Sequence, residues 1–148
     1  MMIRIVPRRV IVTAALCLAA ATALAQTPSF VGTWHGRSTL TGPGGYQVVT
    51  QIEDVFQPDG QFSSMSTSTY GNGAVAGGPI GAVRATGTYT VNSAQSTIEF
   101  RVAEYTSTQP STVQAPYDTA ERFQFLSPTT YTRQSLAGGP VITYQKVQ

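Results

Sequence analysis

The stretch Phe30-Val31-Gly32-Thr33-Trp34-His35-Gly36 (FVGTWHG, residues 30–36) contains the only Trp and the only His of the 148-residue chain. Neighbouring Trp and His side chains either form one site, or one is structural while the other faces solvent. Successive residues of a β-strand point to opposite faces of the sheet. If the stretch is a strand, Trp34 and His35 therefore do not share a site, and we expect His35 to face solvent.

The rest of the chain continues this β pattern. Short runs rich in Val, Ile, Thr, Tyr and Phe are separated by Gly, Pro, Asn and Ser, which are typical of turns. No segment shows a sustained apolar period of 3.6 residues, so we expect no helix longer than one turn. The pattern predicts eight strands, at about 30–40, 46–56, 61–70, 82–91, 97–105, 120–126, 130–136 and 141–147.

Eight consecutive strands with mostly short links predict an all-β fold, an eight-stranded antiparallel up-and-down barrel. A closed barrel leaves no unpaired strand edge exposed. A β-sandwich is the alternative, although connections this short favour a meander.

Alternation counted from Trp34 predicts which side chains face the interior. The apolar members of this inward set include Ile52, Phe56, Phe62, Val83, Tyr89, Ile98, Phe100, Val102, Phe123 and Phe125. Three acids also have inward parity: Glu104 and Glu121 near strand ends, and Asp54, which therefore needs a partner or an open barrel mouth.

Residues 1–25 are typical of a cleaved signal peptide. Arg4, Arg8 and Arg9 precede an apolar run, and Ala23-Leu24-Ala25 is a small-x-small cleavage site. We expect residues 26–148 to form a single domain in the periplasm or outside the cell. The apolar run is too short for a typical spanning helix, so we expect no transmembrane anchor after cleavage.

Cleavage changes the charge and removes the only Cys. The remaining chain keeps six of the nine Lys and Arg residues and all seven Asp and Glu residues, a formal charge of −1. The remaining basic residues are dispersed rather than gathered in a stripe, so we expect no nucleic-acid partner. With Cys17 in the leader, no thiol is left for a disulfide, and the sequence indicates no catalytic residue, metal site or cofactor.

Several short motifs resemble the lipocalin-like, or calycin-type, small exported barrels. They are Gly32-Thr33-Trp34 in the first strand, Phe56-x-Pro58-Asp59-Gly60-x-Phe62, Gly87-Thr88-Tyr89 and Tyr144-x-Lys146. The resemblance covers residues 26–148 in outline. It implies that Trp34 closes one end of the barrel behind Gly32. It also implies that a basic residue, Lys146 or Arg133, lies across the Trp ring.

The direction of Arg133 has two alternatives. Either Tyr131, Arg133 and Ser135 face the interior, or Thr132, Gln134 and Leu136 do. An inward guanidinium must be paired or kept for an anionic guest. In that case the candidate ligand-binding residues are Arg133, Tyr131, Tyr89, Tyr144 and Tyr70.

The function predicted from these features is binding of a small hydrophobic or amphipathic ligand, an anionic one included, inside the barrel. Barrels of about eight strands are either filled by side chains or hold one small ligand. Two alternatives stay open: an envelope structural or interaction module with a packed interior, and a cofactor-free enzyme that uses an interior Arg, Tyr or carboxylate, such as Asp54 or Glu104. The glycine-rich residues 71–81 are a connector or a lid over the barrel mouth.

Overall fold

The computed structural model describes residues 28–72 and 78–147. The predicted signal peptide, residues 1–25, and the middle of the glycine-rich segment, residues 73–77, lie outside this part of the chain. The structure contains the elements β1 (Gly32–Thr41), η1 (Pro43–Gly45), β2 (Gln47–Phe56), β3 (Gln61–Asn72), β4 (Pro79–Asn92), β5 (Thr97–Ser107), β6 (Tyr117–Ser127), β7 (Thr130–Ser135) and β8 (Ile142–Lys146).

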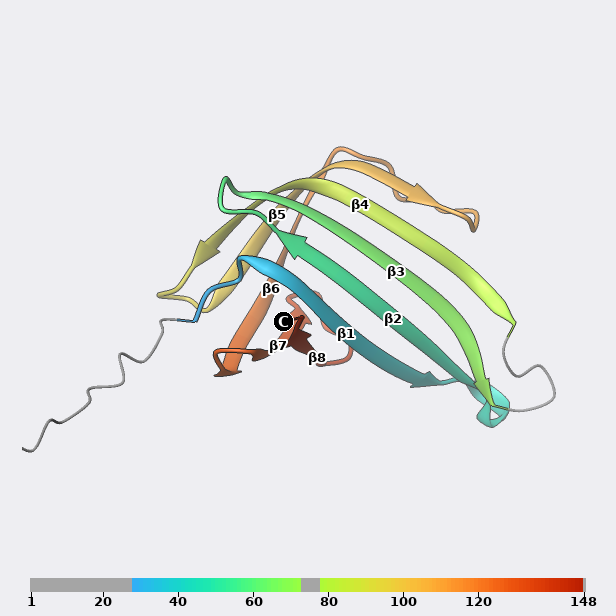
Figure 1. Cartoon of the computed structure of the whole chain (residues 1–148). Helices are drawn as coiled ribbons and strands as arrows, with labels where there is room; N and C mark the ends of the chain where they lie inside the picture. The colour runs from blue at the N-terminus through green and yellow to red at the C-terminus, as the bar shows by residue number, and fades with distance from the viewer. Residues whose placement is uncertain (1–27, 73–77, 148) are drawn as a thin grey trace, which may run out of the picture.

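The eight predicted strands are confirmed, and they form one closed antiparallel barrel in chain order (Figure 1). Strand β1 pairs with β2 along its whole length and with β8 from Trp34↔Lys146 to Arg37↔Thr143. This second pairing closes the sheet, so the fold is a barrel and not a sandwich. No helix in the described part of the chain is long and apolar enough to cross a membrane.

The strands differ in length, and this gives the barrel two unlike ends. Strands β1 to β6 contain 10 to 14 residues, whereas β7 and β8 contain six and five. The wall made by β7 and β8 is therefore short beside the long β1 to β4 (Figure 1). We call the end at residues 57–60, 93–96 and 128–129 the closed end, and the end at η1 and residues 136–141 the open end.

The buried core fills the closed end. It contains Phe30, Trp34, Phe56, Phe62, Ile98, Phe100, Val102, Tyr131 and Tyr144. The indole of Trp34 is completely buried and donates a hydrogen bond from Nε1 to the carbonyl oxygen of Phe30 over 2.6 Å. Lys146 lies across the same ring, with Nζ 5.3 Å from the ring centroid. A Cβ atom on Gly32 would lie 2.8 Å from Lys146 Cε.

A β-bulge in β4 and β5 changes which residues face the interior. The register moves from Gly87↔Val102 to Thr86↔Glu104 across it. Val102 is buried in the core, while Glu104 is exposed and accepts a hydrogen bond from Thr86 Oγ1 at 3.3 Å. The expectation that Glu104 points inward is therefore wrong, because the extra residue of a bulge interrupts simple alternation.

Gly87 allows the two strands to approach at this bulge. A Cβ atom there would collide with the backbone carbonyl oxygen of Arg101. We expect Gly87→Ala to lower the free energy of unfolding by about 1–3 kcal/mol or more, because backbone rather than a flexible side chain must move. Urea unfolding followed by the fluorescence of Trp34 measures this loss.

Gly81→Ala is the matched control in the same strand. Its added methyl group would meet the exposed side chain of Gln109, with the Cγ atom 2.7 Å away. That side chain can move at little cost, so the unfolding free energy of this control should stay close to that of wild type. Equal unfolding free energies for the two variants would contradict the role given to Gly87.

Candidate functional site

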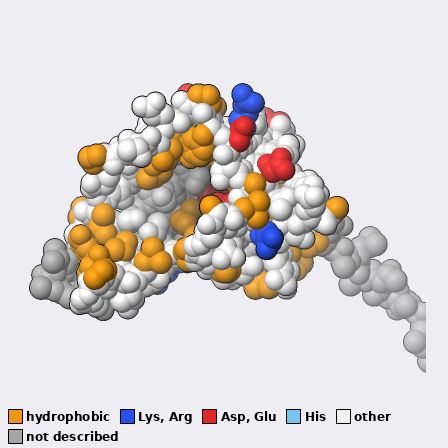
Figure 2. Space-filling view, turned by 180° about the vertical axis from the view of Figure 1, so that it is seen from behind, with side chains coloured by type: hydrophobic (Ala, Val, Ile, Leu, Met, Phe, Trp, Pro, Cys, Tyr) orange, Lys and Arg blue, Asp and Glu red, His pale blue; other side chains and the backbone are white. Residues whose placement is uncertain are grey.

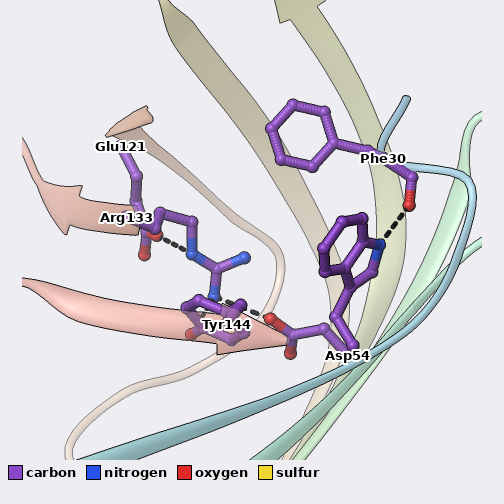
Figure 3. A network of polar contacts seen from close by, with 6 residues as sticks. Phe30, Asp54, Glu121, Arg133 and Tyr144 are labelled. Atoms are coloured by element: carbon purple, nitrogen blue, oxygen red, sulfur yellow. Dashed lines mark hydrogen bonds and ion pairs between the residues drawn. The ribbon is translucent and has the colours of Figure 1, made fainter. Parts of the chain in front are cut away.

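A layer of polar side chains lies on the aromatic core, inside the barrel. Asp54 comes from β2, Glu121 from β6, Arg133 from β7 and Tyr144 from β8 (Figure 3). On β7, Arg133 follows the buried Tyr131 by two residues, so both point inward. The structure therefore selects the inward alternative for Arg133.

Arg133 is held by contacts from four other strands, β2, β5, β6 and β8. Its Nη2 atom lies 2.9 Å from Asp54 Oδ2 and donates a hydrogen bond to the hydroxyl of Tyr144 at 2.8 Å. Its Nε atom forms an ion pair with Glu121 Oε2. The guanidinium carbon also lies 4.6 Å from the centroid of the Tyr144 ring and 5.2 Å from that of Phe100. Arg133 is therefore paired within the protein.

The local sequence explains how these groups meet. Tyr131 and Tyr144 are paired residues of β7 and β8, and their rings stack 4.8 Å apart with an interplanar angle of 3°. Gly36 is the partner of Tyr144 on β1, and a Cβ atom there would lie 2.6 Å from Tyr144 Cε1. The missing side chain at Gly36 leaves the space that the ring occupies beside Arg133.

Some polar atoms of this layer lack a partner. The Asp54 side chain is 1% exposed and that of Arg133 10%. The ion pair between them does not have the alignment of a hydrogen bond. Among the described residues, neither Asp54 oxygen, nor Arg133 Nη1, nor the Tyr131 hydroxyl has a hydrogen-bond partner. A buried polar atom without a hydrogen bond is costly, so these atoms suit a bound water or ligand.

The layer holds two carboxyl groups and one guanidinium. Burial raises the pKa of Glu121, the charge of Arg133 opposes this rise, and the charge of Asp54 adds to it. Burial lowers the pKa of Arg133, but Asp54 first, and then the two tyrosines and Glu121, raise it above its ordinary value. Arg133 therefore stays charged. Burial also raises the pKa of Tyr131 and of Tyr144, so both remain neutral phenols.

Two cavities flank the polar layer. One of about 120 Å³ lies between Asp54, Glu121 and Arg133 and the apolar side chains of Phe62, Phe100 and Val102. The other, of about 230 Å³, extends toward the open end. Ser64, Glu121 and Arg133 line both. Figure 2 shows a face of the molecule that is hollowed, with hydrophobic side chains around the hollow.

The structure brings together some of the predicted ligand-binding residues and separates others. Arg133, Tyr131 and Tyr144 form one group, as described above. Tyr89 lies at the closed end, where its hydroxyl donates to the carbonyl oxygen of Gln57 at 2.9 Å and its ring packs on Phe56. Tyr70 lies toward the open end, with its ring 6.1 Å from that of Tyr46.

His35 lies on the outer surface. Its Nε2 atom is 3.0 Å from Glu53 Oε2, and both side chains are more than half exposed. Trp34 and His35 are thus on opposite faces of β1.

Glu121 belongs to the polar layer, although the sequence predicted only that it lies near a strand end and did not include it among the candidate site residues. Its side chain is 22% exposed and reaches Arg133 inside the barrel. The alternation of β6 gave the signal, because Glu121 has the same parity as Phe123 and Phe125. Asp54 was expected to need a partner, and the structure places Arg133 there.

A comparison with models of known protein families finds no match for this chain. A search among curated proteins finds no similar sequence either. The closed eight-stranded antiparallel barrel agrees in outline with the lipocalin-like fold.

The raised pKa of Glu121 predicts how stability depends on pH. The folded state holds a proton on Glu121 at a pH where the unfolded chain, with an ordinary Glu pKa of about 4.3, has released it. As pH falls from neutral through the raised pKa, the unfolding free energy of wild type should rise relative to that of Glu121→Gln. Urea unfolding of both proteins across this pH range measures the difference.

Glu104→Gln is the control, since this carboxylate is exposed on the outer face. The difference in unfolding free energy between Glu104→Gln and wild type should not show the pH dependence expected for Glu121→Gln. A constant difference between wild type and Glu121→Gln across the pH range would contradict the assigned burial of Glu121.

The Arg133 and Asp54 pair makes a prediction of its own. Arg133→Met leaves a buried carboxylate without its cation, which typically costs about 3–5 kcal/mol. In the double variant with Asp54→Asn, this penalty should be smaller, so the double variant should lose less stability than the sum of the single losses. Chemical unfolding of wild type, the two single variants and the double variant gives the coupling energy between the two side chains.

Arg101→Met is the control, because Arg101 lies on the exposed outer face of β5. Its unfolding free energy should stay close to that of wild type. Strict additivity of Arg133→Met and Asp54→Asn would show that the two side chains do not interact.

Proposed function

We propose that this chain is an exported, lipocalin-like barrel that binds one small hydrophobic or amphipathic molecule beside Arg133, Asp54 and Glu121. The observation that carries the proposal is the position of buried polar atoms without partners. Within the described part of the chain, neither side-chain oxygen of Asp54 has a hydrogen-bond partner, and neither has Arg133 Nη1; both residues line the 120 Å³ cavity. A cavity that combines apolar walls with a few convergent polar groups is typical of ligand sites.

The size and lining of the cavities support a small amphipathic ligand. Together, the cavities of about 120 and 230 Å³ fall near the lower limit of ligand pockets, which range from about 300 to 1,000 Å³. Phe62, Phe100 and Val102 offer apolar contact, while Ser64 and Ser66 offer hydroxyl groups. These cavities favour ligand binding over an interior filled by side chains.

The charges of the site argue against the anionic ligand that the sequence predicted. That prediction assumed an interior Arg133 free to bind a carboxylate. In the structure, Asp54 and Glu121 already contact the guanidinium. A second anion would add to the negative charge, so we propose a ligand without one.

The proposed location rests on the sequence. A basic segment, an apolar run and the Ala23-Leu24-Ala25 site support cleavage after Ala25 and a periplasmic or extracellular barrel. N-terminal sequencing of the protein recovered from the cell envelope or medium tests it. An intact N-terminus would contradict this location.

Native mass spectrometry of the protein purified from its own cells tests ligand binding. We expect a small-molecule adduct on wild type that is lost in Ser64→Phe, because this residue lines both cavities and the larger ring fills the space beside Arg133. Met65→Phe is the matched control, since the next residue points to the outer face, where it is exposed. A wild-type protein without adduct, or equal adducts in both variants, would contradict the proposal.

A further inference from the structure

We propose that the ligand is a small organic amine in its protonated form, whose ammonium group binds between Glu121 and Asp54. This inference rests on the proposed function and specifies its ligand class. The apolar part of the amine would lie against Phe62 and Val102, in the 120 Å³ cavity that these residues line with both carboxylates.

Negative groups outnumber positive ones inside the described barrel. In the described interior, the charged groups that face Glu121 are Arg133 from β7 and Asp54 from β2, and the nearby titratable groups are Tyr131 and Tyr144. With both phenols neutral, two carboxylates share one guanidinium. A buried carboxylate without a matching positive charge is costly. A cationic ligand would neutralise the excess negative charge of the polar layer.

Asp54 and Glu121 supply hydrogen-bond acceptors. Asp54 lines the 120 Å³ cavity, and its buried Oδ1 atom has no hydrogen-bond partner among the described residues. Glu121 lines the same cavity and is partly exposed. An ammonium group has three donors and no acceptor, and it suits two carboxylates that converge on one space.

The walls of the 120 Å³ cavity suit an organic cation. Phe62 and Tyr117 line the cavity, and aromatic faces attract cations as well as apolar groups. Arg133 already lies near the rings of Phe100 and Tyr144. The rings of Phe62 and Tyr117 are therefore the ones that a cationic ligand would contact. The described residues contain no group of three or more His, Cys, Asp or Glu that could hold a metal ion. An organic cation therefore fits these walls better than an inorganic one.

Three probes of nearly equal shape test the inference: 2-phenylethylamine, 2-phenylethanol and phenylacetate. Calorimetry or ligand-observed NMR with the full-length mature protein gives their dissociation constants. We expect the amine to bind at least about tenfold more tightly than the alcohol, as a hydrogen bond to a charged group predicts. Phenylacetate should bind most weakly, because it brings a third carboxylate.

Glu121→Gln removes the charge while it keeps the shape of the side chain. In this variant the preference for the amine over the alcohol should fall severalfold or vanish. Glu104→Gln, on the outer face, should keep the wild-type preference. The circular dichroism and Trp34 fluorescence of each variant report whether the barrel has folded.

The wild-type protein supplies a test that needs no variant. As pH falls through the pKa of Glu121, the carboxylate gains a proton and the affinity for 2-phenylethylamine should fall. The affinity for 2-phenylethanol should stay nearly constant. If Glu121→Gln does not fold, this pH profile decides, and an amine affinity that is constant with pH overturns the inference.

The remaining outcomes separate this inference from the proposed function. Equal or tighter binding of 2-phenylethanol or phenylacetate overturns the amine assignment, and so does the failure of all three probes to bind. If the probes fail but purified wild type carries an adduct that Ser64→Phe loses, the barrel binds a ligand of another class. If the adduct is absent as well, both proposals are wrong.

Discussion

The contact between Arg133 and Asp54 joins two strands that are not neighbours in the sheet. Arg133 comes from β7 and Asp54 from β2, and their side chains meet across the interior with 2.9 Å between Nη2 and Oδ2. Each group is nearly inaccessible to water, so neither charge is tolerable without the other. The pair fixes the two sides of the barrel relative to each other. It also sets the level at which the aromatic core ends and the cavities begin.

The closing seam of the barrel, where β8 pairs with β1 and with β7, depends on side-chain contacts as well as on backbone pairing. Four residue pairs join β8 to β1, and four join it to β7. The stacked rings of Tyr131 and Tyr144 add contact across the β7 and β8 pair, and Gly36 makes room for the second ring. Trp34 and Lys146 cover the seam at the closed end. The same tyrosines that hold the seam also border Arg133, so closure of the barrel and order of the polar layer are coupled.

Runs of β-forming residues between turn residues predicted all eight strands, because this signal is local in the sequence. Alternation along a single strand separated Trp34 from His35 for the same reason. It failed at Glu104, where the bulge opposite Gly87 reverses the pattern. It left Arg133 open, because both faces of β7 offered apolar neighbours, Tyr131 on one and Leu136 on the other. The partners of Arg133 depend on the register and tilt of distant strands, which one sequence does not specify. The sequence predicted a hydrophobic or amphipathic ligand, an anionic one included, whereas an Arg133 already paired with two carboxylates favours a cationic ligand.

The pKa of Glu121 is the property of the site that most directly reflects its buried charges. A ¹³C NMR titration of the side-chain carboxyl groups, with Glu121 assigned by comparison with Glu121→Gln, measures it directly. A buried layer with two carboxylates and one guanidinium predicts that Glu121 titrates above the ordinary value of about 4.3. Saturation with 2-phenylethylamine should then lower that pKa. A Glu121 that titrates at or below the ordinary value, unchanged by the amine, would contradict the account.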